Sequence, residues 1–244
     1  EAASERREIM TIQNRDEFLN QIAKSLGRPV RTKVERPVWK HSPQLEVLKN
    51  ASQDELVEVL KQQCENIHTT FVQTDTANLA NTLHQVVIDY GGESVITWKD
   101  ERFEKFGISK LMEFWPETGI KLYEWNPDTP EENIHQAEKA NIGITISEMT
   151  LAESATAMLY SHPNRGRTMN FLPQNIIVLI PKSSIVPRMT QAAQKIHQQI
   201  EKGQPIPSCI LFMSGPSNSA DIESVLIVGV HGPVKATYIV IEDQ

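Results

Sequence analysis

Apolar residues follow two spacings that alternate along most of the chain. From Ser52 onward, stretches with apolar residues three or four positions apart are followed by short, nearly continuous apolar runs. The first spacing is that of an amphipathic helix, and the second is typical of a buried strand. Because helix-then-strand units repeat, the pattern predicts an α/β protein with a mostly parallel sheet and helices on both of its faces.

Capping residues, glycines and prolines mark the ends of the expected helices. Ser52 and Glu55 have the spacing of a capping box, and the apolar stripe behind them reaches Cys64. Gly91 and Gly203 are expected to end later helices. Beyond the helix that follows Ser52, helices are predicted at residues 77–89, 109–114, 130–140 and 187–202.

Short apolar runs between these helices are predicted to be strands. The run at 175–180 is apolar almost throughout, which suits the centre of a parallel sheet. Strands are expected at residues 68–73, 94–98, 121–125, 142–147, 155–160, 175–180, 209–213 and 236–241.

The N-terminal region has a different pattern. Residues 1–9 are charged and are interpreted as a tag or an extension, while residues 10–50 hold a helix and a basic, proline-containing arm before the main domain at 51–244. The helix is expected at 14–26, with Asn14 and Glu17 at capping-box spacing. Its apolar face suits docking to a partner or subunit, and packing on the chain's own domain is the equally supported alternative.

Charge is unevenly distributed over the chain. The 24 Lys and Arg residues against 31 Asp and Glu give a net charge of −7, which argues against general affinity for nucleic acid or anionic membranes. Residues 154–220 nevertheless contain six basic residues and one acidic residue. This segment is either an ordinary solvated surface or the surround of an anion-binding cleft.

The two cysteines, Cys64 and Cys209, lie far apart inside apolar patterns. They are predicted to be small core residues in a reducing compartment, because an iron–sulfur cluster needs about four thiolates. No apolar window is long enough to span a membrane, and the first residues are charged where a signal peptide would be apolar. A cytoplasmic protein without a bound metal is therefore expected.

The densest candidate for chemistry is the turn SGPSNSADIE at 214–223. It follows the apolar run 209–213, so it is expected to leave a buried strand at its carboxyl end, where open α/β sheets bind ligands. Ser214, Gly215, Ser217 and Asp221 are the candidate ligand contacts. Alternatively, Ser219 caps a helical turn whose own N–H groups the carboxylates satisfy.

Two other segments carry candidate catalytic groups. His231, beside Gly232 in the turn GVHGP, has the chemistry of an acid or base, and Glu153 that of a nucleophile or base. Ser154 and Thr156 follow Glu153 as candidate substrate contacts. Each of these residues also has an ordinary structural interpretation, as a satisfied histidine or a solvated glutamate.

Arg165 and Arg167 flank Gly166 in the turn HPNRGR. Closely spaced arginines suit a carboxylate or phosphate, although two solvated surface arginines would have the same spacing. The common phosphate-loop, dinucleotide, nucleophile-elbow and zinc-protease motifs are missing from the sequence, which removes the main support for those activities.

Taken together, these motifs resemble the lactate-utilisation protein C family, whose fold unit is the LUD domain. The resemblance rests on GITISEMTLAESAT at 143–156, on GR followed by LPQNIIVL up to residue 179, on SGPSNSADIE and on GVHGP. It implies a NagB/RpiA/CoA-transferase-like fold. It also implies oxidation of L-lactate to pyruvate alongside a cysteine-rich and a ferredoxin-like partner that hold iron–sulfur clusters, while this chain binds none.

The alternative function is a free-standing enzyme or a metabolite sensor. It would bind a carboxylate, a phosphorylated compound or an acyl-CoA-like ligand at a site formed by Glu153, Arg167 and His231. Two positions depart from the family pattern: Ala155 stands where relatives have a glycine, and Asn218 where many have an arginine. In the wider CoA-transferase-like fold a glutamate before a glycine can be the nucleophile, so that role for Glu153 rests on analogy of fold.

Overall fold

The structure is a computed structural model that describes residues 13–31, 33, 35, 37–220 and 225–244. The chain divides into two compact units, Glu1–Ser42 and Pro43–Gln244. Within the first unit, helix α2 spans Arg15–Ser25, close to the predicted range. The predicted capping box at its start is wrong, because Asn14 has a left-handed backbone (φ 59°) and its side chain makes no capping hydrogen bond.

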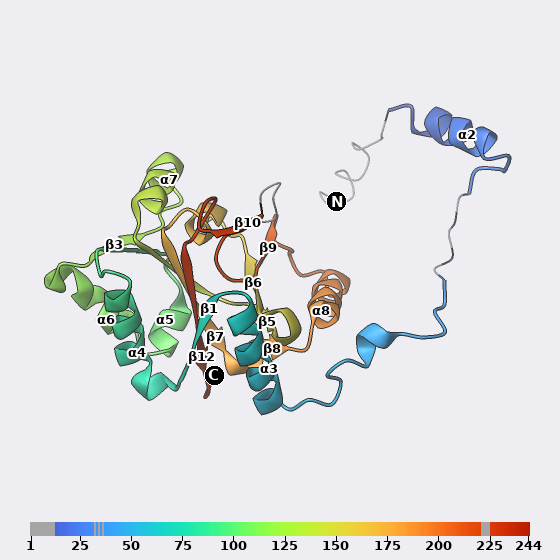
Figure 1. The fold of residues 1–244 in the computed structure, drawn as a ribbon. Coiled ribbons are helices and arrows are strands. Elements are labelled where there is room, and N and C mark those ends of the chain that lie inside the picture. Colours follow the sequence, from blue (N-terminus) through green and yellow to red (C-terminus); the bar gives the residue numbers. More distant parts are fainter. Residues whose placement is uncertain (1–12, 32, 34, 36, 221–224) are drawn as a thin grey trace. The chain divides into compact units, whose positions relative to one another are not determined.

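The second unit is built on a six-stranded sheet in the order β1-β12-β7-β4-β2-β3, in which every neighbouring pair is parallel (Figure 1). This arrangement confirms the α/β prediction. The strands are β1 (Thr69–Thr74), β2 (Ser94–Thr97), β3 (Lys121–Glu124), β4 (Ile142–Ile146), β7 (Asn175–Pro181) and β12 (Lys235–Ile241).

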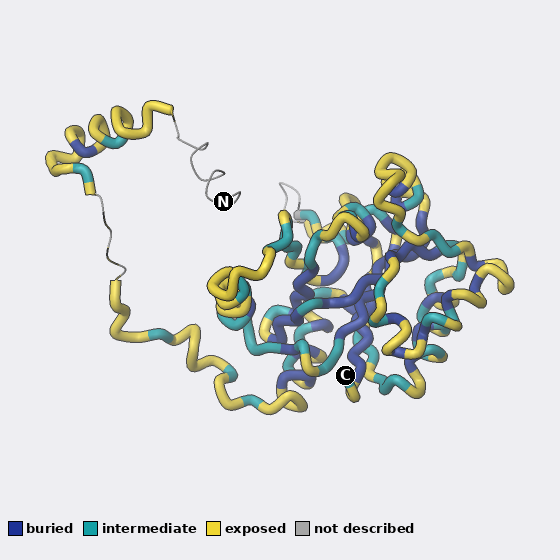
Figure 2. Tube along the Cα trace, turned by 180° about the vertical axis from the view of Figure 1, so that it is seen from behind, coloured by how far each residue is buried: buried dark blue, intermediate teal, exposed yellow. Residues whose placement is uncertain are grey.

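Helices cover both faces of this sheet because its central strands are apolar on both sides. Along β7, Ile177 and Leu179 pack in the cluster that contains the helices of one face, while Val178 packs in the cluster of the other. The first face carries α4 (Thr76–Asp89), α5 (Glu101–Lys105), α6 (Ser109–Phe114) and α7 (Pro130–Lys139), and the second carries α3 (Gln53–Asn66). In Figure 2 the strands between these helices are dark blue, as expected for a buried core.

Helix α3 begins as the sequence predicts. The Ser52 backbone N–H donates to Glu55 Oε2 (2.7 Å), and the Glu55 backbone N–H donates to Ser52 Oγ (3.3 Å), which completes a capping box. Leu60 and Cys64 of this helix are fully buried against the sheet.

A second, smaller sheet has the strand order β8-β5-β6-β9 and was not anticipated from the pattern. It consists of β5 (Met149–Leu151), β6 (Thr156–Tyr160), β8 (Ile185–Val186) and β9 (Ile210–Met213), and β6 is antiparallel to both β5 and β9. Ala157 faces the cluster beneath α3, while Met158 packs with Ala192 of α8 (Met189–Glu201). The small sheet is therefore a layer between the parallel sheet and α8.

Strand β9 corrects one prediction. The run 209–213 was expected to be a buried strand from which a site emerges, but it lies at the edge of the antiparallel sheet and is half exposed. Its apolar composition resembles that of a buried strand, yet only its pairing with β6 determines its place.

The following turn also differs from one of its two interpretations. Ser219 does not cap a helix, because it lies in strand β10 (Asn218–Ala220), which pairs with β11 (Leu226–Val228) in an antiparallel hairpin. Short 3-10 turns, η1 (Pro43–Leu45), η2 (Trp115–Thr118), η3 (Ala152–Ser154), η4 (Arg167–Asn170) and η5 (Lys182–Ser184), complete the connections. Within the described residues, every helix is too short or too polar to cross a bilayer.

Candidate functional site

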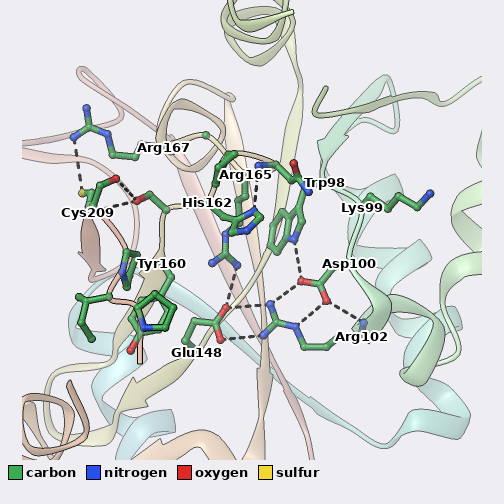
Figure 3. Close-up of a pocket in the computed structure, with 18 of the residues that line it drawn as sticks. Trp98, Lys99, Asp100, Arg102, Glu148, Tyr160, His162, Arg165, Arg167 and Cys209 are labelled. Carbon is green, nitrogen blue, oxygen red and sulfur yellow. Dashed lines mark hydrogen bonds and ion pairs between the residues drawn. The ribbon is translucent and has the colours of Figure 1, made fainter. Parts of the chain in front are cut away.

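The second unit contains a cleft with a volume of about 1120 Å³ between its six-stranded and four-stranded sheets. One wall comes from the segment after β2, and the other from the end of β6 with the turn that follows it and from the segment that precedes β9 (Figure 3). The cleft is lined by Trp98–Arg102, Glu148, Tyr160–Arg167 and Pro205–Cys209.

The cleft lies where the strand order of the parallel sheet changes direction. After β2 the chain continues through α5 and α6 to β3, at the edge of the sheet, whereas after β4 it continues to β7 on the opposite side. Two connections that diverge in this way leave a crevice at the carboxyl ends of their strands. Trp98 to Arg102 follow β2 and Glu148 follows β4, so both reach the cleft from that crevice.

A network of two arginines and two carboxylates forms the floor of the cleft. Arg102 is bidentate to both acids: its Nε and Nη2 donate to Asp100 at 2.9 and 2.7 Å, and its Nη1 and Nη2 donate to Glu148 at 3.2 and 3.0 Å. The Trp98 indole N–H donates to Asp100 Oδ2 at 2.9 Å. Arg165 Nη1 donates to Glu148 Oε1 at 3.1 Å. The loops after β2, β4 and β6 are thereby joined (Figure 3).

Within the network, the contact between Asp100 and Arg102 favours the ionised form of both side chains. Burial alone would raise the pKa of Asp100, but hydrogen bonds from Arg102 and attraction to its guanidinium bring that pKa below its ordinary value. Burial likewise works against the charge on Arg102, yet its bonds to Asp100 and the attraction of Glu148 raise its pKa. Arg102 therefore acts as a fixed cation between two carboxylates.

Arg165 has a different environment. Its side chain is 6% exposed and its guanidinium carbon lies 4.7 Å from the centre of the Trp98 ring, a cation–π contact. Burial lowers the pKa of Arg165, and attraction to Glu148 opposes that shift only in part. Among the described residues, Glu148 is the acceptor for its side chain, and its buried Nε has none. The guanidinium stays charged, so Arg165 is a desolvated cation that still has N–H groups available to donate to a further acceptor.

Packing explains the glycine of the Arg165 turn. His162 and Arg165 form an isolated antiparallel bridge, which closes the turn. At Gly166, an added Cβ would lie 1.9 Å from the ring of Trp125, whose own N–H donates to the Pro163 carbonyl at 3.2 Å. The turn therefore packs directly against Trp125, the residue that follows β3, and only glycine fits at position 166.

Arg167 and Cys209 lie at the rim of the cleft. The Arg167 Nη1 donates to Cys209 Sγ at 3.8 Å. Cys209 is half-buried, which corrects the prediction that both cysteines are core residues; only Cys64 is. Cys209 directly precedes β9, which lies at the edge of its sheet and has a neighbouring strand on one side only.

The predicted residues Ser154, Thr156 and Ser214 form a chain of hydroxyls. Thr156 Oγ1 is 2.7 Å from both Ser154 Oγ and Ser214 Oγ. Glu153 pairs with Arg188 Nε at 2.8 Å. These residues lie at the start of β6, whereas Arg165 and Arg167 come after its end, so the two groups occupy opposite ends of that strand.

Gly215 has a structural explanation. Its backbone is left-handed (φ 72°) and its N–H donates to the Tyr238 hydroxyl at 3.1 Å. That hydroxyl donates in turn to the Met213 carbonyl at 3.0 Å, and burial raises the pKa of Tyr238. An added Cβ at Gly215 would lie 2.5 Å from Thr69 Oγ1.

The second glycine turn packs against the first. The Ser217 N–H donates to the Pro233 carbonyl, and the Gly229 N–H donates to the Ser217 carbonyl, both at 2.9 Å. An added Cβ on Gly232 would lie 3.2 Å from Ser217 Cβ. His231 is exposed beside it, and Asp221 lies outside the described residues.

The sequence prediction thus found Arg165 and Arg167 but not their partners. Asp100, Arg102 and Glu148 were not predicted, although carboxylates two or three residues after the apolar runs SVIT and IGITI are a signal that could have found the site. The catalytic roles given to Glu153 and His231, and the ligand contacts at the second end of β6, stay predictions.

The fold and the cleft define an α/β protein with a parallel sheet and an arginine–carboxylate network at its switch point. Comparison with known proteins identifies the family: the sequence profile of the LUD domain matches residues 57–241. The chain belongs to the LUD domain family, which confirms the resemblance seen in its motifs.

Relatives match over almost their whole length. The chain is 53% identical to "Lactate utilization protein C" of Geobacillus sp. (strain WCH70) and 52% identical to the protein of that name from Bacillus subtilis (strain 168). Both alignments cover 96% of this chain and 98% of the relative. A crystal structure of a DUF162 family protein from Deinococcus radiodurans superposes with a TM-score of 0.54 at 15% identity, over 78% of this chain and 99% of that one, which supports the fold alone.

Proposed function

We propose that this chain is a component of L-lactate utilisation, in which L-lactate is oxidised to pyruvate. The observation that carries the proposal is the identity of about half of all residues to proteins named "Lactate utilization protein C" across 96% of the chain. The aligned region includes the six-stranded sheet, the four-stranded sheet and the residues that line the cleft, so the similarity is not limited to one motif.

The proposal assigns electron transfer to partner proteins. Oxidation of lactate to pyruvate releases two electrons and two protons, and the electrons pass to iron–sulfur clusters in a cysteine-rich and a ferredoxin-like partner. Two cysteines are too few for a cluster, which needs about four thiolate ligands. Burial also raises the pKa of Cys64 to about 12, which disfavours the thiolate that a metal requires. The residues of this chain therefore fit a role beside the clusters.

Growth on L-lactate tests the proposal. Deleting the gene for this chain, with its neighbours intact, is expected to abolish growth on L-lactate but not on pyruvate, and a plasmid copy is expected to restore it. Native purification of the restored, tagged chain is expected to recover proteins with the absorption of iron–sulfur clusters. Normal growth of the deletion strain on L-lactate would contradict the proposal.

The cleft favours one alternative, a free-standing enzyme or metabolite sensor for an anionic ligand. Its volume and its buried arginine are features of a ligand site. The alternative predicts that the deletion strain grows normally on L-lactate and that the chain purifies without cluster-containing proteins. The cytoplasmic location expected from the sequence stays a prediction in either case.

A further inference from the structure

We propose that the cleft binds an amphipathic anion of cofactor size, whose carboxylate or phosphate group pairs with Arg165. The inference goes beyond the proposed function and does not depend on it. It concerns what the purified chain binds, whichever process the chain serves.

The first argument is the number of donors that Arg165 leaves unused. A guanidinium has five N–H donors. Arg102 uses three nitrogens in four hydrogen bonds to two carboxylates, whereas Arg165 makes one hydrogen bond, to a Glu148 that Arg102 already holds in bidentate fashion. An incompletely paired, buried cation gains most from a further anion, because water screens it little.

Charge around the cleft supports the same ligand. Asp100 and Glu148 are both held by Arg102. Beyond that network, the lining carries Lys99 and Arg167 against a single acid, Glu101. The two arginines of the network balance its two carboxylates, so Lys99, Arg167 and Glu101 leave the lining with a net charge of +1. An anion that enters it meets attraction from both walls.

The opposite wall supplies the argument for an apolar body. Pro205, Ile206 and Pro207, which join α8 to β9, line the cleft together with Tyr160. Ile206 is half-buried without being part of a core cluster. The volume of about 1120 Å³ also slightly exceeds the range for pockets that hold drug-sized ligands, roughly 300–1,000 Å³. A three-carbon acid would fill only a small part of it.

The test compares anionic heads with and without an apolar body. Octanoate and adenosine 5′-monophosphate provide a carboxylate and a phosphate on a larger body, while L-lactate and inorganic phosphate provide the heads alone. Calorimetric titration of the purified full chain at low salt is expected to show at least one large probe binding about 10-fold or more tighter than its head alone. Binding of octanoate would indicate a site for carboxylates, and binding of adenosine 5′-monophosphate would indicate a site for phosphates.

Two variants locate the binding. Ile206→Glu places a negative charge on the apolar wall in a loop, and Arg165→Lys removes the planar guanidinium while keeping the charge. Each substitution is expected to raise the Kd of the large probe about 10-fold or more. Ile134→Glu is the matched control, because Ile134 is 46% exposed on α7 and does not line the cleft; it is expected to bind like the unchanged chain.

Three results would overturn the proposal. They are failure of both large probes to bind, binding of a head alone as tightly as its larger probe, and equal loss of affinity in the Ile206 and Ile134 variants. Because Arg165 is buried, the binding result of its variant counts only if the circular dichroism spectrum is native. If the Arg165 variant fails to fold, the variant of Ile206, a half-buried residue in the segment between α8 and β9, still decides the test.

Discussion

At the scale of single residues, Gly215 shows how closely the two glycine turns are fitted to the parallel sheet. Gly215→Ala is expected to lower the free energy of unfolding by about 2–5 kcal/mol, because a left-handed alanine costs about 1–2 kcal/mol and overpacking about 1–3 kcal/mol. The added methyl group would meet Thr69 Oγ1 and the Ile67 carbonyl.

Denaturant unfolding measures this loss, and Gly107→Ala is its control. Gly107 is also left-handed (φ 75°), but an added Cβ there meets no atom within 4 Å. The control is therefore expected to lose only the backbone contribution, about 1–2 kcal/mol. Equal losses in both variants would show that the contacts of Gly215 contribute nothing.

Cys64 gives a prediction about pH. Burial raises its pKa from 9.0 to about 12, so between these values the folded chain holds a proton that the unfolded chain releases. The stability from this group is complete below pH 9 and falls as the pH rises towards 12. Cys64→Ala is expected to flatten that part of the stability profile, measured by urea unfolding from pH 8 to 11.

A thiol reagent provides the second measurement. At pH 8 the native chain is expected to react at Cys209 alone, which is half-buried at the rim of the cleft, and to expose the Cys64 thiol only on unfolding. Cys209→Ser is the control that should leave no fast-reacting thiol. Rapid reaction of Cys64 in the native chain would contradict its place in the core.

At the scale of elements, the Arg165 turn depends on its contact with the end of β3. Gly166→Ala is expected to destabilise the chain by about 1–3 kcal/mol, since its Cβ would overlap the Trp125 ring. In a Trp125→Leu background the same change is expected to cost at least about 1 kcal/mol less, because the ring is gone. A double-mutant cycle from denaturant unfolding measures this coupling, and additive losses would show that the ring does not restrict Gly166.

Most of the elements were predictable because their signals are local. The capping box at Ser52 and the period of α3 both appear in the structure where the sequence placed them. The small antiparallel sheet was not predictable, since β5 has three residues, β8 has two, and the composition of β9 suits a buried strand equally well. The arrangement of the small sheet depends on pairing between segments that are distant in the sequence. Asn14 shows a different failure: its spacing from Glu17 fits a capping box, but its left-handed backbone does not.

At the scale of the whole molecule, the cleft could be located only in part from the sequence. Arg165 was found because a second arginine lies two residues away, but its acceptor Glu148 lies 17 residues earlier in the chain, and Arg102, which binds the same carboxylate, lies 63 residues earlier. Only the order of the strands brings Glu148 and Arg102 to one crevice. A single sequence indicates where the strands are but not their order in the sheet. The arginine–carboxylate network could therefore not be predicted from it.

The division into two units predicts how the chain tolerates truncation. All three apolar clusters that join sheets and helices come from Pro43–Gln244, within residues 48–241. A chain that begins at Pro43 is therefore expected to unfold cooperatively with a Tm within about 2 °C of the full chain, measured by calorimetry. A much lower Tm would show that the first unit stabilises the second. The same truncated chain, tested for growth on L-lactate, separates folding from the predicted docking role of α2.

Strand β12 has a consequence for the order of events during synthesis. It pairs with both β1 and β7, so two strands made earlier share a partner made more than fifty residues after β7. Until residues 235–241 leave the ribosome, the middle of the sheet has a gap and both neighbouring edges remain open to other chains. Nascent chains of this protein therefore need protection at the edges of β1 and β7 until β12 has been made and has paired with both strands.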